Sequence, residues 1–167
     1  MQVEATAIAS AGLGELAVVK HSEMLLMARG LGSCIGIAVY EPHNRIAALA
    51  HVMLPGPAPA GPPADQPARF ADQAIVSIIA AVERLGGRPR DCIIKLAGGA
   101  QVIRLASKDD KLQVGKRNIA AVQEALERHG LRIAGQNVGG TVGRTLTVYA
   151  ATGVTTVRLV GGVEEPL

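Results

Sequence analysis

Aromatic residues are scarce in this chain, which has no tryptophan and only Tyr40, Phe70 and Tyr149. Proteins that bind single-stranded nucleic acid stack the bases on aromatic side chains, so this chain lacks the material for such a platform. The 17 Lys and Arg residues outnumber the 14 Asp and Glu residues, but they are scattered along the chain. We therefore expect a solvated basic surface and no nucleic-acid partner.

Cysteine is scarce as well, because Cys34 and Cys92 are the only two. They form neither a disulfide framework nor a Cys/His metal motif, which favours a reducing compartment. No stretch approaches the roughly 18 apolar residues of a membrane span, and the first residues lack the pattern of a signal peptide. We expect a cytoplasmic protein with no membrane insertion.

The remaining composition is that of a globular protein, since 49% of the 167 residues are hydrophobic and can form one core. The patterns predict a single α/β domain over 1–167, a mixed β-sheet or sandwich of about eight strands flanked by two main helices, with a Cys-His pair on an early hairpin. The expected strands are 15–19, 24–28, 35–40, 46–54, 91–97, 131–134, 144–150 and 154–160. The first expected helix begins at 65–67 and ends at 85, and the second covers 116–129.

Two segments between these elements read as loops. Residues 55–63 are too rich in proline for a helix or an inner strand, and they follow His51 closely. They are expected to flank a cleft and to help select a substrate. The polar residues 107–111 lead into the second helix.

The early hairpin is the most informative feature. Turn residues 41–44 separate two apolar strands. A two- or four-residue loop centred on this turn places Val39 opposite Ile46 and Cys34 opposite His51. Directly opposed side chains have Cβ atoms roughly 4.5–5.5 Å apart on one sheet face, so we expect a thiol–imidazole contact. A three-residue loop would shift the register and separate the pair.

Cys34 and His51 are the candidate catalytic residues. An unpaired cysteine is usually a small buried hydrophobe, and a histidine in an apolar strand is usually a satisfied core residue. The predicted pairing favours a nucleophile and a general base instead. Backbone N–H groups at the bend of Gly32 and Ser33 are the expected oxyanion donors.

The other candidates are less informative. Cys92 lies in an apolar strand and is assigned no role. His21, His43 and His129 fall near turns or helix ends and are expected on the surface.

Several short motifs are distinctive in combination: GLGSC at 30–34, AHVMLP at 50–55, KLAGGA at 95–100, GKRN at 115–118, Gly139-Gly140 followed by Arg144, and Gly161-Gly162. With these motifs the chain resembles the CheD family of chemoreceptor glutamine deamidases in bacterial and archaeal chemotaxis. The resemblance implies a cysteine amidohydrolase that converts receptor glutamines to glutamates through a Cys34 thioester, with His51 as base and acid and without metal or organic cofactors.

The chain departs from the family pattern at two positions. The family's third catalytic residue, a threonine, would fall on Ala28, which has no hydroxyl; a backbone carbonyl or Ser33 is the candidate substitute. Asn137 stands where the family often carries an acidic residue.

The sequence leaves two other functions open. The resemblance implies chemoreceptor cytoplasmic helices as substrate and a CheC-type phosphatase as a further partner, so one alternative is a weakly active or inactive regulatory partner of that phosphatase. The other is a cysteine hydrolase of a different amide.

Overall fold

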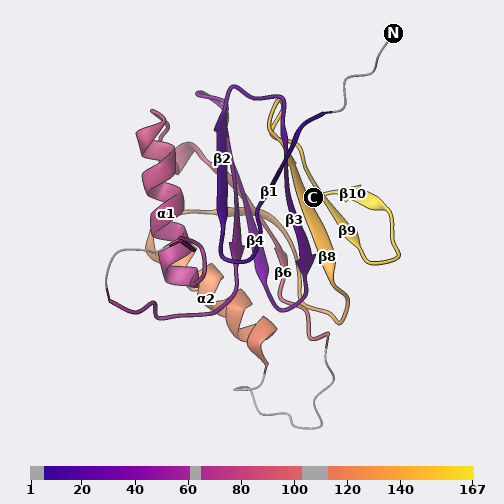
Figure 1. Ribbon diagram of the computed structural model, residues 1–167. Coiled ribbons are helices and arrows are strands. Elements are labelled where there is room, and N and C mark those ends of the chain that lie inside the picture. The colour runs from indigo at the N-terminus through magenta and orange to yellow at the C-terminus, as the bar shows by residue number, and fades with distance from the viewer. Residues whose placement is uncertain (1–5, 61–64, 103–112) are drawn as a thin grey trace.

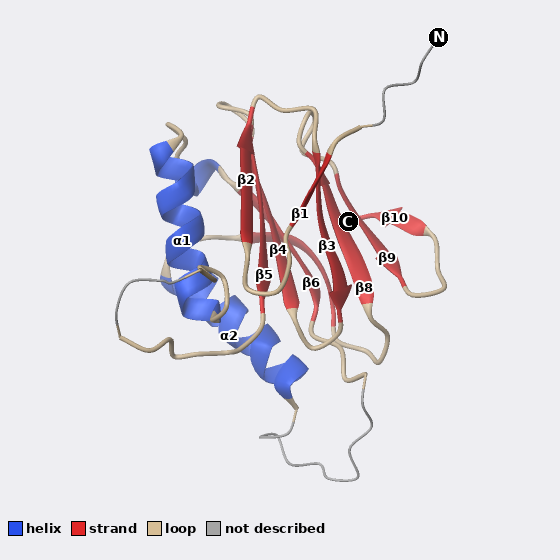
Figure 2. Ribbon diagram, viewed as in Figure 1, coloured by secondary structure: helices blue, strands red, loops and turns tan. Residues whose placement is uncertain are grey.

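The computed structural model describes residues 6–60, 65–102 and 113–167. Two mixed five-stranded sheets stack face to face, and two helices cover the free face of one of them (Figures 1 and 2). The first sheet has the order β1 (Ile8–Ser10), β3 (Leu25–Leu31), β8 (Arg144–Tyr149), β9 (Thr155–Leu159) and β10 (Glu164–Pro166). The second has the order β2 (Leu16–Lys20), β5 (Ile46–Val52), β4 (Ile35–Glu41), β6 (Ile93–Gly98) and β7 (Ile133–Val138).

The helices are α1 (Ala71–Arg84) and α2 (Val114–Arg128), and a short 3₁₀ helix, Pro89–Asp91, precedes β6. In α1, buried residues recur at helical spacing and face the second sheet, as its apolar pattern predicts. Among the described helices, none has the length and apolar character needed to cross a membrane.

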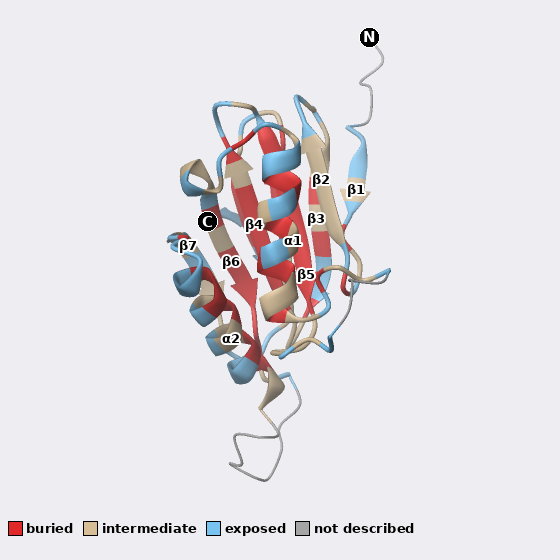
Figure 3. Cartoon of the chain, turned by 90° about the vertical axis from the view of Figure 1, so that its left-hand side faces the viewer, coloured by how far each residue is buried: buried red, intermediate tan, exposed pale blue. Residues whose placement is uncertain are grey.

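Two hydrophobic cores lie on the two faces of the second sheet. One fills the space between the sheets, and the other lies between the second sheet and the helices. Every residue of β5 is buried because both of its faces are covered, and Figure 3 shows β4 and β5 as a buried layer behind α1. A polar side chain on β5 is therefore desolvated, whichever face it occupies.

The structure confirms the predicted α/β class, and most strands lie close to the expected ranges. The first helix begins at Ala71, which is later than the predicted start at 65–67. The structure also adds β1 and β10, which have only three residues each and are too short to show a sequence period. The bend of Gly32 and Ser33 follows β3 directly, because β3 continues to Leu31 through an irregularity after Ala28. The predicted polar stretch 107–111 lies outside the described residues, as do residues 61–63 of the proline-rich segment.

The predicted hairpin register is wrong by two residues. Glu41 pairs with Ile46, so the residue opposite His51 is Gly36 and not Cys34. The turn explains the difference: Arg45 adopts a left-handed conformation with φ of 49°, which keeps it in the loop. The Glu41 carboxylate also accepts a hydrogen bond from the Asn44 N–H at 2.7 Å.

Candidate active site

The candidate residues lie where several chain segments meet at one end of the sandwich. Cys34 immediately precedes β4 and is half-buried, whereas His51 is the penultimate residue of β5 and is only 2% exposed. The ends of β3, β5 and β6 and the start of β8 lie at this same end (Figure 1).

Cys34 and His51 share one face of the second sheet. The register differs from the prediction by two residues, and because side chains alternate with a period of two, such a shift preserves the face. Cys34 lies in the bend just before β4, whose first residue Ile35 pairs with Val52. Its side chain packs against the core between the sheets, on the face that His51 also occupies.

The imidazole of His51 has a defined tautomer. Its Nδ1 lies 2.9 Å from the backbone carbonyl oxygen of Ala11. A carbonyl only accepts, so Nδ1 must carry the hydrogen and Nε2 presents a lone pair in the neutral ring. Nε2 is buried without a hydrogen-bond partner among the described residues. The ring is therefore held in the form that can take a proton at Nε2.

The loop that supplies this carbonyl is itself fixed by backbone hydrogen bonds. The Ala11 N–H donates to Met27 O at 2.8 Å, which fastens the loop to β3. The N–H of His51 donates to Glu15 O at 3.0 Å, and the N–H of Gly14 donates to His51 O at 2.9 Å. The orienting carbonyl is thus part of a rigid backbone frame around His51.

Burial shifts both side chains toward their neutral forms. Desolvation lowers the pKa of His51 below its usual value; the Ala11 hydrogen bond and the charge of Glu15 partly oppose this shift. Desolvation also raises the pKa of the Cys34 thiol. Burial therefore favours the thiol form of Cys34 and the neutral form of the His51 imidazole.

The backbone around Cys34 is clamped by the loop that follows β6. The Gly99 N–H donates to Cys34 O at 2.8 Å, and the Ala100 N–H donates to Gly32 O at 2.7 Å. Gly98 has φ of 119°, and a Cβ there would lie 2.1 Å from Cys34 O. Glycine is required at this position because the two backbones touch.

The N–H groups of the predicted oxyanion donors Gly32 and Ser33, and of the neighbouring Cys34, differ in their hydrogen bonding. The Gly32 N–H already donates to Gly30 O at 2.9 Å. Outside the strand ladders, the described contacts include no acceptor for the N–H of Ser33 or Cys34. The predicted Gly32 donor is therefore already used within its own bend.

Arg144 supports this clamp from the first sheet, a role that the sequence did not reveal. It is buried, and its guanidinium donates to the backbone carbonyls of Asn137 at 2.7 Å and Val142 at 3.1 Å, and also to the Asn137 side chain and Gly139 O. The Gly139 N–H in turn donates to Gly98 O at 2.9 Å. Desolvation lowers the pKa of Arg144.

The remaining candidates lie elsewhere. Cys92 is half-buried against the helix-side core, and desolvation raises its pKa to about 12, so its thiol stays protonated. His21, His43 and His129 are exposed, as predicted. Within residues 6–60, 65–102 and 113–167, no three His, Cys, Asp or Glu side chains gather as a metal site.

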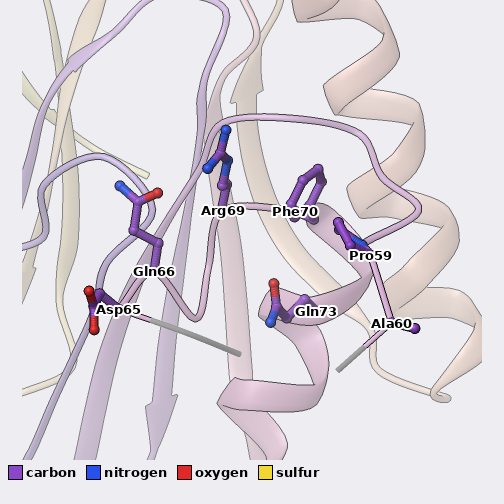
Figure 4. Close-up of a pocket in the computed structure, with 7 residues that line it drawn as sticks. All are labelled: Pro59, Ala60, Asp65, Gln66, Arg69, Phe70 and Gln73. Atoms are coloured by element: carbon purple, nitrogen blue, oxygen red, sulfur yellow. The ribbon is translucent and has the colours of Figure 1, made fainter. Parts of the chain in front are cut away.

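A pocket of about 460 Å³ lies between the proline-rich segment and the start of α1. Its described lining residues are Pro59, Ala60, Asp65, Gln66, Arg69, Phe70 and Gln73 (Figure 4). Its lining residue Arg69 is bonded to the segment that follows β5, because the N–H groups of Met53 and Leu54 both donate to Arg69 O at 3.0 Å. Gln66 also donates to Leu13 O at 3.1 Å, in the loop that orients His51.

Comparisons with known proteins identify the family. The model for "CheD chemotactic sensory transduction" matches residues 53–159, which is more than half of the chain. The chain belongs to the CheD family. The family model begins after Cys34 and His51, whereas alignments to whole CheD proteins extend further.

Two CheD relatives illustrate this extent. A protein of Symbiobacterium thermophilum named "Probable chemoreceptor glutamine deamidase CheD" is 40% identical over 93% of this chain and 94% of its own length. A protein of the same name from Archaeoglobus fulgidus is 39% identical over 85% of this chain and 87% of its own. Among solved structures, the Bacillus licheniformis hypothetical protein YfiH shares 14% identity over 70% of this chain and 46% of its own, with a TM-score of 0.38, which is too low to indicate a shared fold.

Proposed function

We propose that this CheD protein hydrolyses the side-chain carboxamide of selected glutamines in chemoreceptor cytoplasmic helices, giving glutamate and ammonia. The observation that supports this most directly is the neutral His51 ring, held by Ala11 O with a free Nε2 on the sheet face of Cys34. A receptor substrate is suggested by the names of the relatives.

In the first half of the reaction, Nε2 of His51 accepts the Cys34 thiol proton. The thiolate attacks the glutamine carboxamide carbon, and the backbone N–H groups of Ser33 and Cys34 stabilise the oxyanion. The His51 imidazolium then donates its proton to the departing nitrogen. Ammonia leaves, and a Cys34 thioester of the substrate side chain is formed.

In the second half, neutral His51 accepts a proton from water, whose oxygen attacks the thioester carbonyl. The tetrahedral adduct collapses, and the leaving Cys34 sulfur takes the proton back from His51. The products are a glutamate side chain and the original thiol. The overall change is one water consumed and one ammonia released.

The orienting role of the family threonine is assigned to the carbonyl of Ala11. Ala28 is fully buried in the core between the sheets, together with Ala11. Ala11 O already satisfies Nδ1, so a hydroxyl at position 28 is not needed to fix the tautomer.

The proposal is tested by ammonia release from a chemoreceptor cytoplasmic fragment incubated with the wild-type protein, Cys34→Ala, or buffer. Release by the wild type alone is expected. No release from a cognate receptor by reduced wild-type protein would contradict the deamidase. If that protein still bound a CheC-type phosphatase, the regulatory alternative would replace the enzyme.

A further inference from the structure

Asn118 on α2 is fully buried and reaches two chain segments far away in sequence. Its Nδ2 lies 2.9 Å from Ser33 O and 2.9 Å from Met53 O. Both acceptors are carbonyls, so the atom facing them must be the amide nitrogen, and its two hydrogens are both used. The side chain thus joins the residue before Cys34 to the residue two positions after His51.

These two hydrogen bonds lie just beyond the last paired residues of β4 and β5. The last pair of β4 and β5 is Ile35 with Val52. Beyond it, the N–H of Met53 turns away to Arg69 O. The backbone at Cys34 is therefore held to the His51 strand by the Asn118 amide rather than by strand pairing.

We propose that Asn118 is a positioning residue that sets the separation and orientation of the Cys34 thiol relative to His51 Nε2. Its two hydrogen bonds go to backbone carbonyls on each side of the pair, so it acts through the backbone. Misplacement of reacting groups by about 1 Å can cost about 100-fold in rate, so loss of this bridge should affect chemistry more than substrate binding.

The test compares three residues at position 118 by the number of N–H or O–H groups that they can donate. Asparagine donates two, Asn118→Ser donates one and Asn118→Ala donates none. Gln123→Ala is the matched control, because Gln123 also lies on α2 and its amide donates at 3.0 Å to an exposed partner, Gln136. All variants carry Cys92→Ser, so that Cys34 is the only thiol.

Two readouts are expected to change together. The kcat for deamidation of the receptor fragment should fall about 10- to 100-fold in Asn118→Ala and less in Asn118→Ser, with KM within about twofold. The pH dependence of Cys34 alkylation by iodoacetamide should also shift, whereas Gln123→Ala should leave both unchanged. The serine variant keeps the test usable if the alanine variant does not fold.

The kcat measurement rests on the proposed deamidase function, whereas the alkylation of Cys34 can be measured without it. If folded position-118 variants keep the wild-type alkylation profile and kcat, or lose only melting temperature, the positioning role is overturned. If the wild type releases no ammonia while the alkylation profile still shifts with position 118, the deamidase fails and the positioning role stands.

Discussion

The imidazole Nδ1 of His51 donates to the carbonyl oxygen of Ala11 at 2.9 Å, across 40 residues of sequence. This bond gives the neutral ring one tautomer and leaves Nε2 without a partner among the described residues. In the proposed mechanism, Nε2 accepts the Cys34 proton, and Ala11 O takes the orienting role for which Ala28 has no hydroxyl.

Replacing His51 should remove the base without removing the nucleophile. We expect His51→Gln to lower kcat by about 10²–10⁴, the usual contribution of general acid–base assistance. His43→Gln is the matched control, because His43 is exposed on the hairpin turn. Initial rates of ammonia release measure the effect. Activity of His51→Gln within a few-fold of the control would refute the role of His51 as the general base.

The lowered pKa of His51 should make stability depend on pH. The folded protein holds the ring neutral, whereas the unfolded chain protonates it below about 6.5. The contribution of the neutral ring to the free energy of unfolding is thus fully present above about pH 6.5. It is lost as the pH falls through the lowered pKa of His51 in the folded protein. The melting temperature should fall less between pH 7.5 and 5 in His51→Gln than in the wild type. An equal fall in melting temperature in both proteins would contradict the lowered pKa of His51.

Gly99 offers a test of the clamp on Cys34. Gly99 and Gly130 have φ of 70° and 69°, but a Cβ on Gly99 would lie 2.4 Å from Ile119, whereas nothing lies within 4 Å at Gly130. Both alanine variants carry the same backbone strain, and only the one at position 99 adds a steric clash. We therefore expect Gly99→Ala to lose about 1–3 kcal/mol more stability than Gly130→Ala. Its kcat should also fall, because its N–H holds Cys34 O. Chemical denaturation and ammonia release measure these effects, and equal behaviour of the two variants would disprove the clamp.

Restoring the family threonine should bring no large gain. Ala28 is fully buried, so Ala28→Thr adds volume to a closed core and should cost about 1–3 kcal/mol. We expect kcat within about threefold of the wild type, because Ala11 O already orients the ring. A tenfold increase in kcat would show that the carbonyl does not replace the hydroxyl.

The sequence predicts the class of the fold and the face that Cys34 and His51 share, because both follow from hydrophobic period. It misplaces the hairpin register because an arginine at position 45 gives no sign that it will take a left-handed conformation. Ala11 and Asn118 could not be assigned roles, since their partners lie 40 and 65 to 85 residues away and depend on how the layers pack.

The central claim is tested most directly by mass spectrometry of a chemoreceptor fragment after incubation with the wild-type protein or with Cys34→Ala, in the presence and absence of hydroxylamine. The account predicts glutamate at selected glutamine sites with the wild type, glutamyl hydroxamate at the same sites when hydroxylamine intercepts the Cys34 thioester, and neither with Cys34→Ala. Equal conversion by both proteins, or unchanged glutamines with reduced wild-type protein and a cognate receptor, would contradict it.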